Sequence, residues 1–384
     1  MHHFYFDHNA TTPVAPEVLE TVVSSLGQVY GNASSIHHFG QAAKQRLEAA
    51  RRQVASLLHA SPTEVVFTSG GTEADNLAIF GVFRAAARPS AHFITSAIEH
   101  PAVLAPSVIL EREGVAVTRL PVGAGGSVNP EDVRRALRPE TVLVSIMHAN
   151  NETGIVQPIA EIARITRAAG VLLHVDGVQA LGKIPVDVEA LGADLYSMSA
   201  HKLYAPKGVG ALYVRKGTAI APTAFGGHHE RDRRPGTENV PGIAALGAAA
   251  ELAMRSLAAE SERLSALRDR LENAVLGRIS GTGINGARWN RTPNTSNIYF
   301  DGVDGEAMVI ALDLRGFAVS TGSACSSGAI TPSHVLTAMG LSADRARASL
   351  RFSLGRSNTA EQVDALTDAL EASVAHLRRI SVHA

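Results

Sequence analysis

The chain has 384 residues, too many for one ordinary hydrophobic core, so two or three folding units are expected. Its 35 basic and 36 acidic residues nearly cancel, which gives no reason to expect a nucleic-acid or membrane-surface partner. The single cysteine excludes an intrachain disulfide and an all-thiolate metal site. The start resembles no signal peptide and no run approaches a membrane span of about 18 apolar residues, so we expect a cytoplasmic protein.

Short strand-like runs alternate with helical stretches through the first two-thirds of the chain. Strands are predicted at 64–69, 92–97, 115–120, 141–149, 171–177, 194–199 and 209–214. Segments such as GTEADNLAIFGVFRAAA and PIAEIARITRAAG, which lie between them, are typical of helices. This alternation predicts an α/β fold with a mainly parallel sheet covered by helices on both faces.

A long Ala- and Leu-rich helical pattern runs from about residue 241 to about residue 275. Fewer strands, mixed with helices, follow it. We therefore predict a domain boundary inside this helix, near residue 255. A large domain would cover 15–255, and a smaller α+β domain would cover 256–384 together with 1–14.

Polar residues follow most of the predicted strands, at the edge where open α/β sheets bind ligands. They are the helix start at 68–72, Glu99-His100, Asn150-Asn151, Asp176 and Ser199-Ala200-His201-Lys202. Taken singly, each could be a helix cap, a buried histidine or a surface charge. Together they suit pyridoxal phosphate, which needs a phosphate cradle, a lysine for a Schiff base and a carboxylate for its ring nitrogen.

Two glycine-containing patterns resemble nucleotide-binding loops. Residues 177–183 match most of a P-loop, but Ile184 stands where the Mg²⁺-binding hydroxyl would be, and Pro185 argues against a following helix. The glycines at 123–127 predict a turn. The 16 histidines show no metal-ligand spacing, so we expect no metal.

Cys325 lies in a stretch of small and polar residues, TGSACSSGA. Most free cysteines are buried and inert, which is the alternative interpretation. The flanking residues have no apolar periodicity, so an exposed loop and a reactive thiol are favoured.

The stretch DLYSMSAHKLYAPKGVGAL resembles the lysine signature of class V aminotransferases, a subgroup of pyridoxal-phosphate fold type I. YFDHNATTP, FTSGGTEADN, IEHPAV, HANNETG, HVDGVQ and STGSACSSGAITPSHVL resemble, in order, cysteine desulfurases of the NifS/IscS type. The resemblance implies a large domain with a mainly parallel seven-stranded sheet and a smaller C-terminal domain that carries the cysteine loop.

The same resemblance assigns residue roles. Lys202 would carry the cofactor and Cys325 would receive sulfur, with His100 stacked on the ring. Asp176 would pair with the ring nitrogen and Gln179 with the phenolic oxygen. The phosphate would be held by Gly71, Thr72, Ser199, His201 and, from the other subunit of a homodimer, Thr237. Asn151 and Arg351 would bind the substrate carboxylate.

The implied reaction converts L-cysteine to L-alanine and leaves a persulfide on the enzyme, for a protein acceptor in iron–sulfur cluster, tRNA or cofactor synthesis. The chain ends soon after its last predicted helix, where IscS-type chains continue into a segment that docks the iron–sulfur scaffold, so the acceptor stays open. A selenocysteine lyase or another class V aminotransferase is an alternative that would not need the thiol. A non-catalytic persulfide scaffold is a second alternative.

Overall fold

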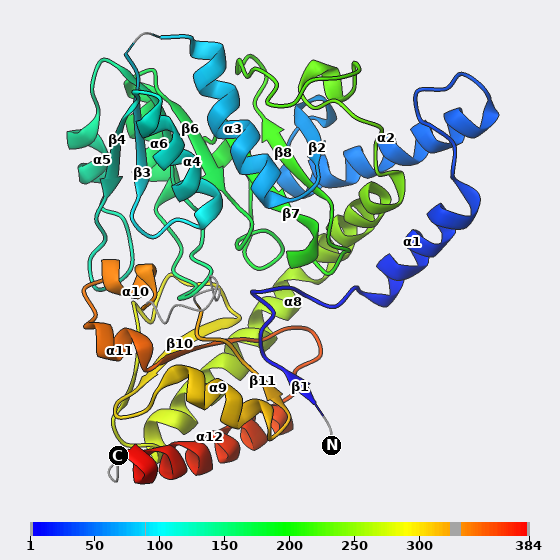
Figure 1. The fold of residues 1–384 in the computed structure, drawn as a ribbon. Coiled ribbons are helices and arrows are strands. Elements are labelled where there is room, and N and C mark those ends of the chain that lie inside the picture. Colours follow the sequence, from blue (N-terminus) through cyan, green and yellow to red (C-terminus); the bar gives the residue numbers. More distant parts are fainter. Residues whose placement is uncertain (1–2, 89, 323–331, 382–384) are drawn as a thin grey trace.

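The computed structural model describes residues 3–88, 90–322 and 332–381. It forms two lobes joined by one long helix, α8 (Val240–Arg278) (Figure 1). The larger lobe contains a seven-stranded sheet in the order β2-β8-β7-β6-β5-β3-β4. Its strands are β2 (Val65–Thr68), β3 (His92–Ser96), β4 (Ala116–Leu120), β5 (Thr141–Ser145), β6 (Leu172–Asp176), β7 (Leu195–Ser199) and β8 (Gly210–Val214).

Only β8 runs against the other strands of this sheet, because it pairs antiparallel with both β2 and β7. The remaining neighbours pair in parallel. The predicted α/β fold with a mainly parallel seven-stranded sheet is therefore confirmed. All strand ends that precede a predicted site residue also meet at one edge of the sheet.

Helices cover both faces of the sheet: α1 (Pro16–Gln28), α2 (His38–Leu58), α3 (Gly71–Ala86), α4 (Pro101–Arg112), α5 (Pro130–Ala136), α6 (Ile159–Ala168) and α7 (Val188–Leu191). Successive strand residues point to opposite faces. Leu143 packs in the cluster that contains α3 and α4 residues, and Val144 packs in the cluster that contains α2, α6 and α8 residues. The continuous apolar runs of these strands follow from burial on both sides.

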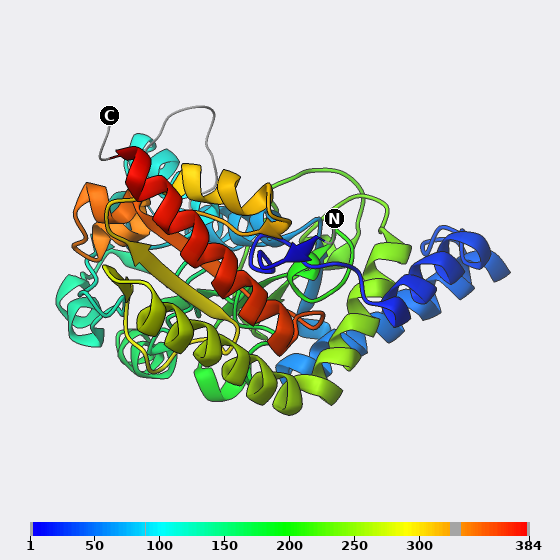
Figure 2. The ribbon, with the colours of Figure 1, turned by 90° about the horizontal axis from the view of Figure 1, so that it is seen from below.

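The smaller lobe has an antiparallel sheet ordered β12-β10-β9 and a two-stranded parallel sheet of β1 with β11. These strands are β1 (Phe4–Tyr5), β9 (Thr282–Ile284), β10 (Thr295–Phe300), β11 (Phe317–Ala318) and β12 (Ser349–Ser353). Its helices are α9 (Gly305–Asp313), α10 (His334–Ala338), α11 (Ala343–Arg347) and α12 (Ala360–Ser381). Figure 2 shows α12 beside the second half of α8, where Arg270 and Asp364 form an ion pair of 2.6 Å.

The helix α8 contributes to the cores of both lobes. Its buried apolar residues as far as Ala253 belong to the larger core, and those from Leu264 onward belong to the smaller one. Phe6 packs in the smaller core. The domain boundary near residue 255, with 1–14 in the smaller domain, stays a prediction that this packing supports. By length and composition α8 could also cross a membrane, but 56% of its apolar window is buried, as in a core helix of a globular protein.

Candidate active site

Asp176 ends β6 at the edge of the sheet that faces the smaller lobe. Its side chain is buried and accepts a hydrogen bond of 2.9 Å from the backbone N–H of Val178. Burial and the nearby Asp75 carboxyl raise the pKa of Asp176 to about 6. Among the described residues Asp176 forms no ion pair, although the charges of His100 and His174 lower its pKa somewhat. A protonated ring nitrogen would supply a close cationic partner.

Lys202 lies in a short 3₁₀ turn (Ala200–Lys202) directly after β7, the neighbour of β6. Its Nζ donates to the backbone oxygens of Asn9, at 2.5 Å, and of Ala10, at 2.6 Å. Burial and the positive charge of Arg351 lower the pKa of Lys202 to about 8. About a tenth of this amine is unprotonated at pH 7, which is far more than for an ordinary lysine and is the form that a nucleophile or base requires.

The start of α3 provides backbone N–H donors at the strand ends that carry Asp176 and Lys202. The helix has no side-chain cap, so its first N–H groups are free for an anion. A Cβ on Gly71 would lie 2.8 Å from Cγ2 of Val178 and 3.4 Å from Cβ of Ser199. Only glycine lets the helix approach the β6 and β7 ends this closely, while Thr72 next to it is exposed.

His100 caps α4, and its Nδ1 accepts a 3.1 Å hydrogen bond from the backbone N–H of Ala102. Desolvation by neighbouring residues lowers the pKa of His100, the charge of Asp176 raises it in part, and the charges of Lys202 and His334 lower it further. The side chain is exposed, which a stacking role requires. It lines a cavity of about 320 Å³ together with Thr72, Asn76, Phe80, Pro101, Ala102, Ala105, Pro106 and Ile109.

The N-terminal segment supports Gln179 and His201. The buried Gln179 accepts at Oε1 from Nζ of Lys183 (2.5 Å) and donates from Nε2 to the oxygen of Asn9 (3.0 Å). Nδ1 of His201 pairs with Oγ1 of Thr11 at 3.1 Å. Burial lowers the pKa of His201 to about 4, so its ring is neutral near pH 7.

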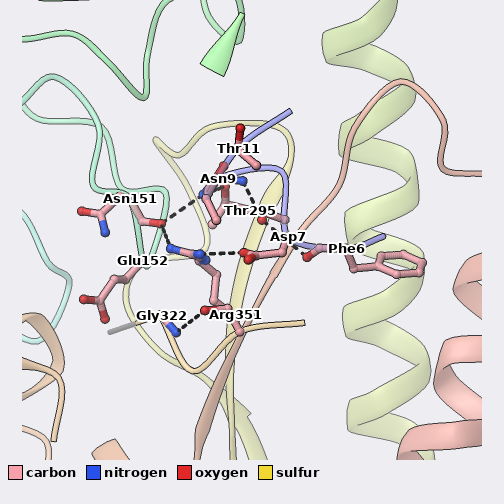
Figure 3. Close-up of polar contacts among 12 residues, drawn as sticks. Phe6, Asp7, Asn9, Thr11, Asn151, Glu152, Thr295, Gly322 and Arg351 are labelled. Carbon is pink, nitrogen blue, oxygen red and sulfur yellow. Dashed lines mark hydrogen bonds and ion pairs between the residues drawn. The ribbon is translucent and has the colours of Figure 1, made fainter. Parts of the chain in front are cut away.

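Arg351, in the middle of β12, reaches the site from the smaller lobe (Figure 3). Its Nη1 donates to the backbone oxygen of Asn151 at 3.0 Å, and its Nη2 donates to Oδ1 of Asp7 at 2.6 Å. Nε is buried and has no partner in the described structure. The predicted pair Asn151 and Arg351 is therefore in contact, although through the backbone of Asn151.

Cys325 lies outside the described residues, and its predicted loop cannot be compared with the structure. Gly322, the last described residue before Cys325, and Ser333, the second described residue after it, both lie against the buried Glu152. Oγ of Ser333 donates to Oε2 of Glu152 at 2.6 Å, and a Cβ on Gly322 would lie 3.1 Å from the same oxygen. Thr237 is exposed before α8.

Three residues that contact the site were not singled out from the sequence. They are Asp7, Asn9 and Lys183. Asp7 and Asn9 belong to the quoted YFDHNATTP stretch, and Lys183 belongs to the P-loop-like stretch. Both stretches were visible as motifs, but their partners lie far away in the chain. As predicted, no helix directly follows residues 177–183, which form turns, and residues 123–127 contain the predicted turn.

The described residues fit pyridoxal phosphate. They provide a lysine with a lowered pKa, a buried carboxylate that forms no ion pair with another described residue, backbone donors at the start of α3 and an exposed imidazole ring. In the described parts of the chain, no group of three or more His, Cys, Asp and Glu side chains could hold a metal ion.

Comparison with known proteins gives the same family as the motifs. The family model "Aminotransferase class-V" matches residues 4–366. "Cysteine desulfurase IscS" of Dictyoglomus turgidum is 48% identical over 98% of this chain and 96% of its own length. A solved "NifS-like protein" is 37% identical, with a TM-score of 0.92 over 98% of this chain and 100% of its own.

A further solved structure, "SspA in complex with cysteine", has a TM-score of 0.82 and 37% identity over 91% of this chain and 98% of its own. Because the family model and these relatives each span nearly the whole chain, it belongs to the class-V aminotransferase family, as its lysine signature predicted.

Proposed function

We propose that this chain is a pyridoxal-phosphate-dependent cysteine desulfurase that converts L-cysteine to L-alanine and transfers the sulfur to Cys325. The observation that carries the proposal is the pair formed by Lys202 and Asp176 at neighbouring strand ends, with perturbed pKa values on both. Relatives named cysteine desulfurase match almost the full length, and one similar structure holds cysteine.

The protein side chains have separate tasks in this reaction. Bound pyridoxal phosphate supplies an electron sink for the substrate carbon that carries the amino group. Asp176 would hold the ring nitrogen, the start of α3 with Ser199 and His201 would hold the phosphate, and His100 would cover the ring. The amine of Lys202 would hold the cofactor covalently and, as a free amine, would accept the proton from the substrate carbon.

Arg351 orients the substrate. Among the described residues its Nε–H has no acceptor, so this edge of the guanidinium is left for a carboxylate while Asp7 and Asn151 keep their contacts. Cys325 then acts as a thiolate on the substrate sulfur. A sulfur–sulfur bond forms, the carbon–sulfur bond breaks with its electrons returning to the organic fragment, and that fragment is protonated and released as alanine.

The proposal includes a cytoplasmic homodimer in which Thr237 reaches the partner subunit's phosphate site. An apolar stripe on α1 and just beyond it supports an association. Leu19, Val23, Leu26 and Tyr30 follow helical spacing and are each at least 51% exposed. Sulfur delivery to a protein acceptor, such as an iron–sulfur scaffold, completes the proposed role.

The first test is spectroscopic. Purified protein with pyridoxal phosphate should absorb visible light, and borohydride reduction should fix the cofactor to Lys202. Lys202→Ala should lose the fixed adduct and all alanine production. A reduced adduct on a different lysine would show that the assignment is wrong.

The second test separates the desulfurase from a selenocysteine lyase or another aminotransferase. Cys325→Ser should keep cofactor binding and the spectral response to L-cysteine, but should release neither sulfide nor alanine, because a hydroxyl is a poor nucleophile toward sulfur. Lys202→Ala is the matched control, because it should lose the covalent cofactor adduct as well as the products. Wild-type rates of sulfide release in Cys325→Ser would favour the lyase.

A further inference from the structure

The turn after β6 brings Gln179 and Lys183 together. Residues 177–184 form consecutive turns, in which the N–H of Ala180 donates to the oxygen of Gly177 and the N–H of Lys183 donates to the oxygen of Ala180, both at 3.0 Å. Residues four apart in such a coil lie on one side. The P-loop-like glycine pattern therefore builds a side-chain contact at the site instead of a nucleotide cradle.

This contact determines which way the Gln179 amide faces. The amine of Lys183 donates to Oε1 of Gln179 at 2.5 Å and to Oδ1 of Asn9 at 2.8 Å. The backbone oxygen of Asn9, which can only accept, receives Nε2 of Gln179 at 3.0 Å. A flipped amide would set its NH₂ group against the amine and its oxygen against a carbonyl oxygen. Both ends of the amide are thus fixed by partners of opposite kind.

One of the two N–H groups of the Gln179 side-chain amide is not used by Asn9. Nε2 carries two hydrogens, and the protein accepts one of them through Asn9. The same Asn9 oxygen also accepts from Nζ of Lys202 at 2.5 Å. The second N–H of Gln179 therefore belongs to the same small region as the cofactor lysine, where it is available to a ligand oxygen.

We propose that Lys183 is a positioning residue that fixes the Gln179 amide so that an N–H, and not the carbonyl oxygen, faces the phenolic oxygen of bound pyridoxal phosphate. This inference rests on the proposed function and on the cofactor contact assigned to Gln179. It gives the P-loop-like lysine a role that does not involve a nucleotide.

The role is independent of the charge on Lys183. Burial lowers the pKa of Lys183 well below its usual range, and the charges of Lys202 and Arg351 lower it further. His8 is a third titratable neighbour, because the Lys183 charge lowers the pKa of that imidazole. A neutral amine still has two N–H donors, one for Gln179 and one for Asn9. Because the neutral amine also has a lone pair, the Asn9 carbonyl is then the partner that excludes the flipped amide, and Lys183 supplies the hydrogen bond that holds Oε1 in place.

The expected effect is a shift in how the bound cofactor titrates. A hydrogen bond donated to the phenolic oxygen stabilises its anionic form and lowers the proton affinity of the chromophore. Lys183→Met, which is similar in length but has no donor, should raise the midpoint pH of the visible absorbance by about one unit. Gln179→Ala should raise it by a similar amount.

A double-mutant cycle tests whether Lys183 acts through Gln179. In the Gln179→Ala background, Lys183→Met should add less than a quarter of its shift in the wild-type background. An equal shift in both backgrounds, or none in the wild-type background, would overturn the proposal, since a direct charge effect does not need the amide. The measurement is made on holoenzyme reconstituted with pyridoxal phosphate.

A second variant keeps the test decisive if Lys183→Met does not fold. Gln179→Glu retains an acceptor for Lys183 and removes the donor, so its midpoint should also rise, and an unchanged midpoint would overturn the inference. Failure of the proposed function has a different signature: the wild-type protein itself would bind no cofactor or would form no alanine from L-cysteine. Unshifted variants of a coloured, active enzyme reject only the role of Lys183.

Discussion

Asp176 is a buried carboxylate whose ionisation determines how well the site accepts a protonated ring nitrogen. Its pKa of about 6 in the ligand-free protein is raised by burial and by Asp75. Below that pH the carboxyl is protonated before the cofactor binds, and the ion pair is lost. Asp176 should therefore link cofactor affinity to pH in the range from 7 to 5.

We expect the Kd for pyridoxal phosphate to weaken by up to about tenfold for each pH unit below 6 because of this one proton. Equilibrium titration at pH 7, 6 and 5 measures it. Asp176→Asn should bind weakly and retain only the pH dependence of the cofactor phosphate, which also titrates near pH 6. Identical slopes in both proteins would exclude Asp176 as the coupled group.

Glu99 is fully buried, and one of its carboxyl oxygens has no partner in the described structure. The other accepts from Oγ of Ser96 at 2.5 Å and from the backbone N–H of Met147 at 3.0 Å. Burial raises the pKa of Glu99 to about 8. Because the folded pKa exceeds the unfolded one, the stability from this group is complete below about pH 4.3 and is lost as pH rises through 8.

Because the stabilisation by Glu99 is lost as pH rises, the free energy of unfolding of the apoprotein should fall by about 2 kcal/mol more between pH 6 and pH 8 in wild type than in Glu99→Gln. The glutamine keeps an acceptor for Ser96 and Met147 but does not titrate. Urea unfolding at the two pH values gives both differences. Parallel losses in the two proteins would mean that Glu99 titrates normally.

At the scale of elements, the segment before α8 is held in an unfavourable backbone conformation. Glu230, Arg231 and Asp232 have φ values of 45°, 57° and 63° in succession. The left-handed region is costly for residues other than glycine, at about 1–2 kcal/mol each. A buried ion pair holds this segment: both guanidinium Nη atoms of Arg51 donate to Glu230, at 2.7 and 2.8 Å, and Glu230 also accepts from the N–H of Phe67.

Glu230→Ala should lower the free energy of unfolding by about 3–5 kcal/mol, because it leaves Arg51 buried and unpaired. It should also weaken cofactor binding, since Thr237 lies seven positions further along the same segment. Asp364→Ala is the control: it breaks an exposed ion pair with Arg270 and should leave the urea midpoint unchanged. Similar midpoints for the two variants would contradict this reading of the segment.

The features that could be predicted from the sequence are those that depend on residues close together in the chain. The strands around Asp176 and Lys202 were recognisable because each is a short apolar run with a polar residue at its end. Asn9 was recognisable only as part of a motif, since its partners Gln179, Lys202 and Ser353 lie 170, 193 and 344 positions away. No local periodicity encodes such contacts. The pairing of Arg351 with Asp7 and with the backbone of Asn151 was hidden for the same reason.

At the scale of the whole molecule, α1 and the start of α2 project from the larger lobe and present the apolar stripe described above (Figure 1). The opposite face of α1, which includes Val18, is buried against the rest of the chain. An exposed stripe of this kind favours a second copy of the chain as its cover, in a two-fold dimer.

The combined change Val23→Glu and Leu26→Glu should convert the dimer to monomer and reduce activity through the loss of Thr237 from the partner site. Sedimentation velocity at assay concentration measures the first effect. Ile310→Glu with Leu314→Glu, which alters exposed apolar residues of the smaller lobe, is the matched control and should leave the dimer intact. An active monomer would refute the dimer.

The segment between β1 and α1 passes between the lobes, and its contacts have a consequence for synthesis on the ribosome. The N–H of Asn9 donates to Oγ of Ser353 at 2.9 Å, and Phe6 packs with Phe352 in the smaller core. These partners are among the last residues to be translated, whereas Asn9 is among the first. The contacts that Asn9 makes with Lys202 and with Ser353 can therefore all form only when almost the whole chain has been translated. We therefore expect the site around Lys202 to be complete only when synthesis of the chain is nearly finished.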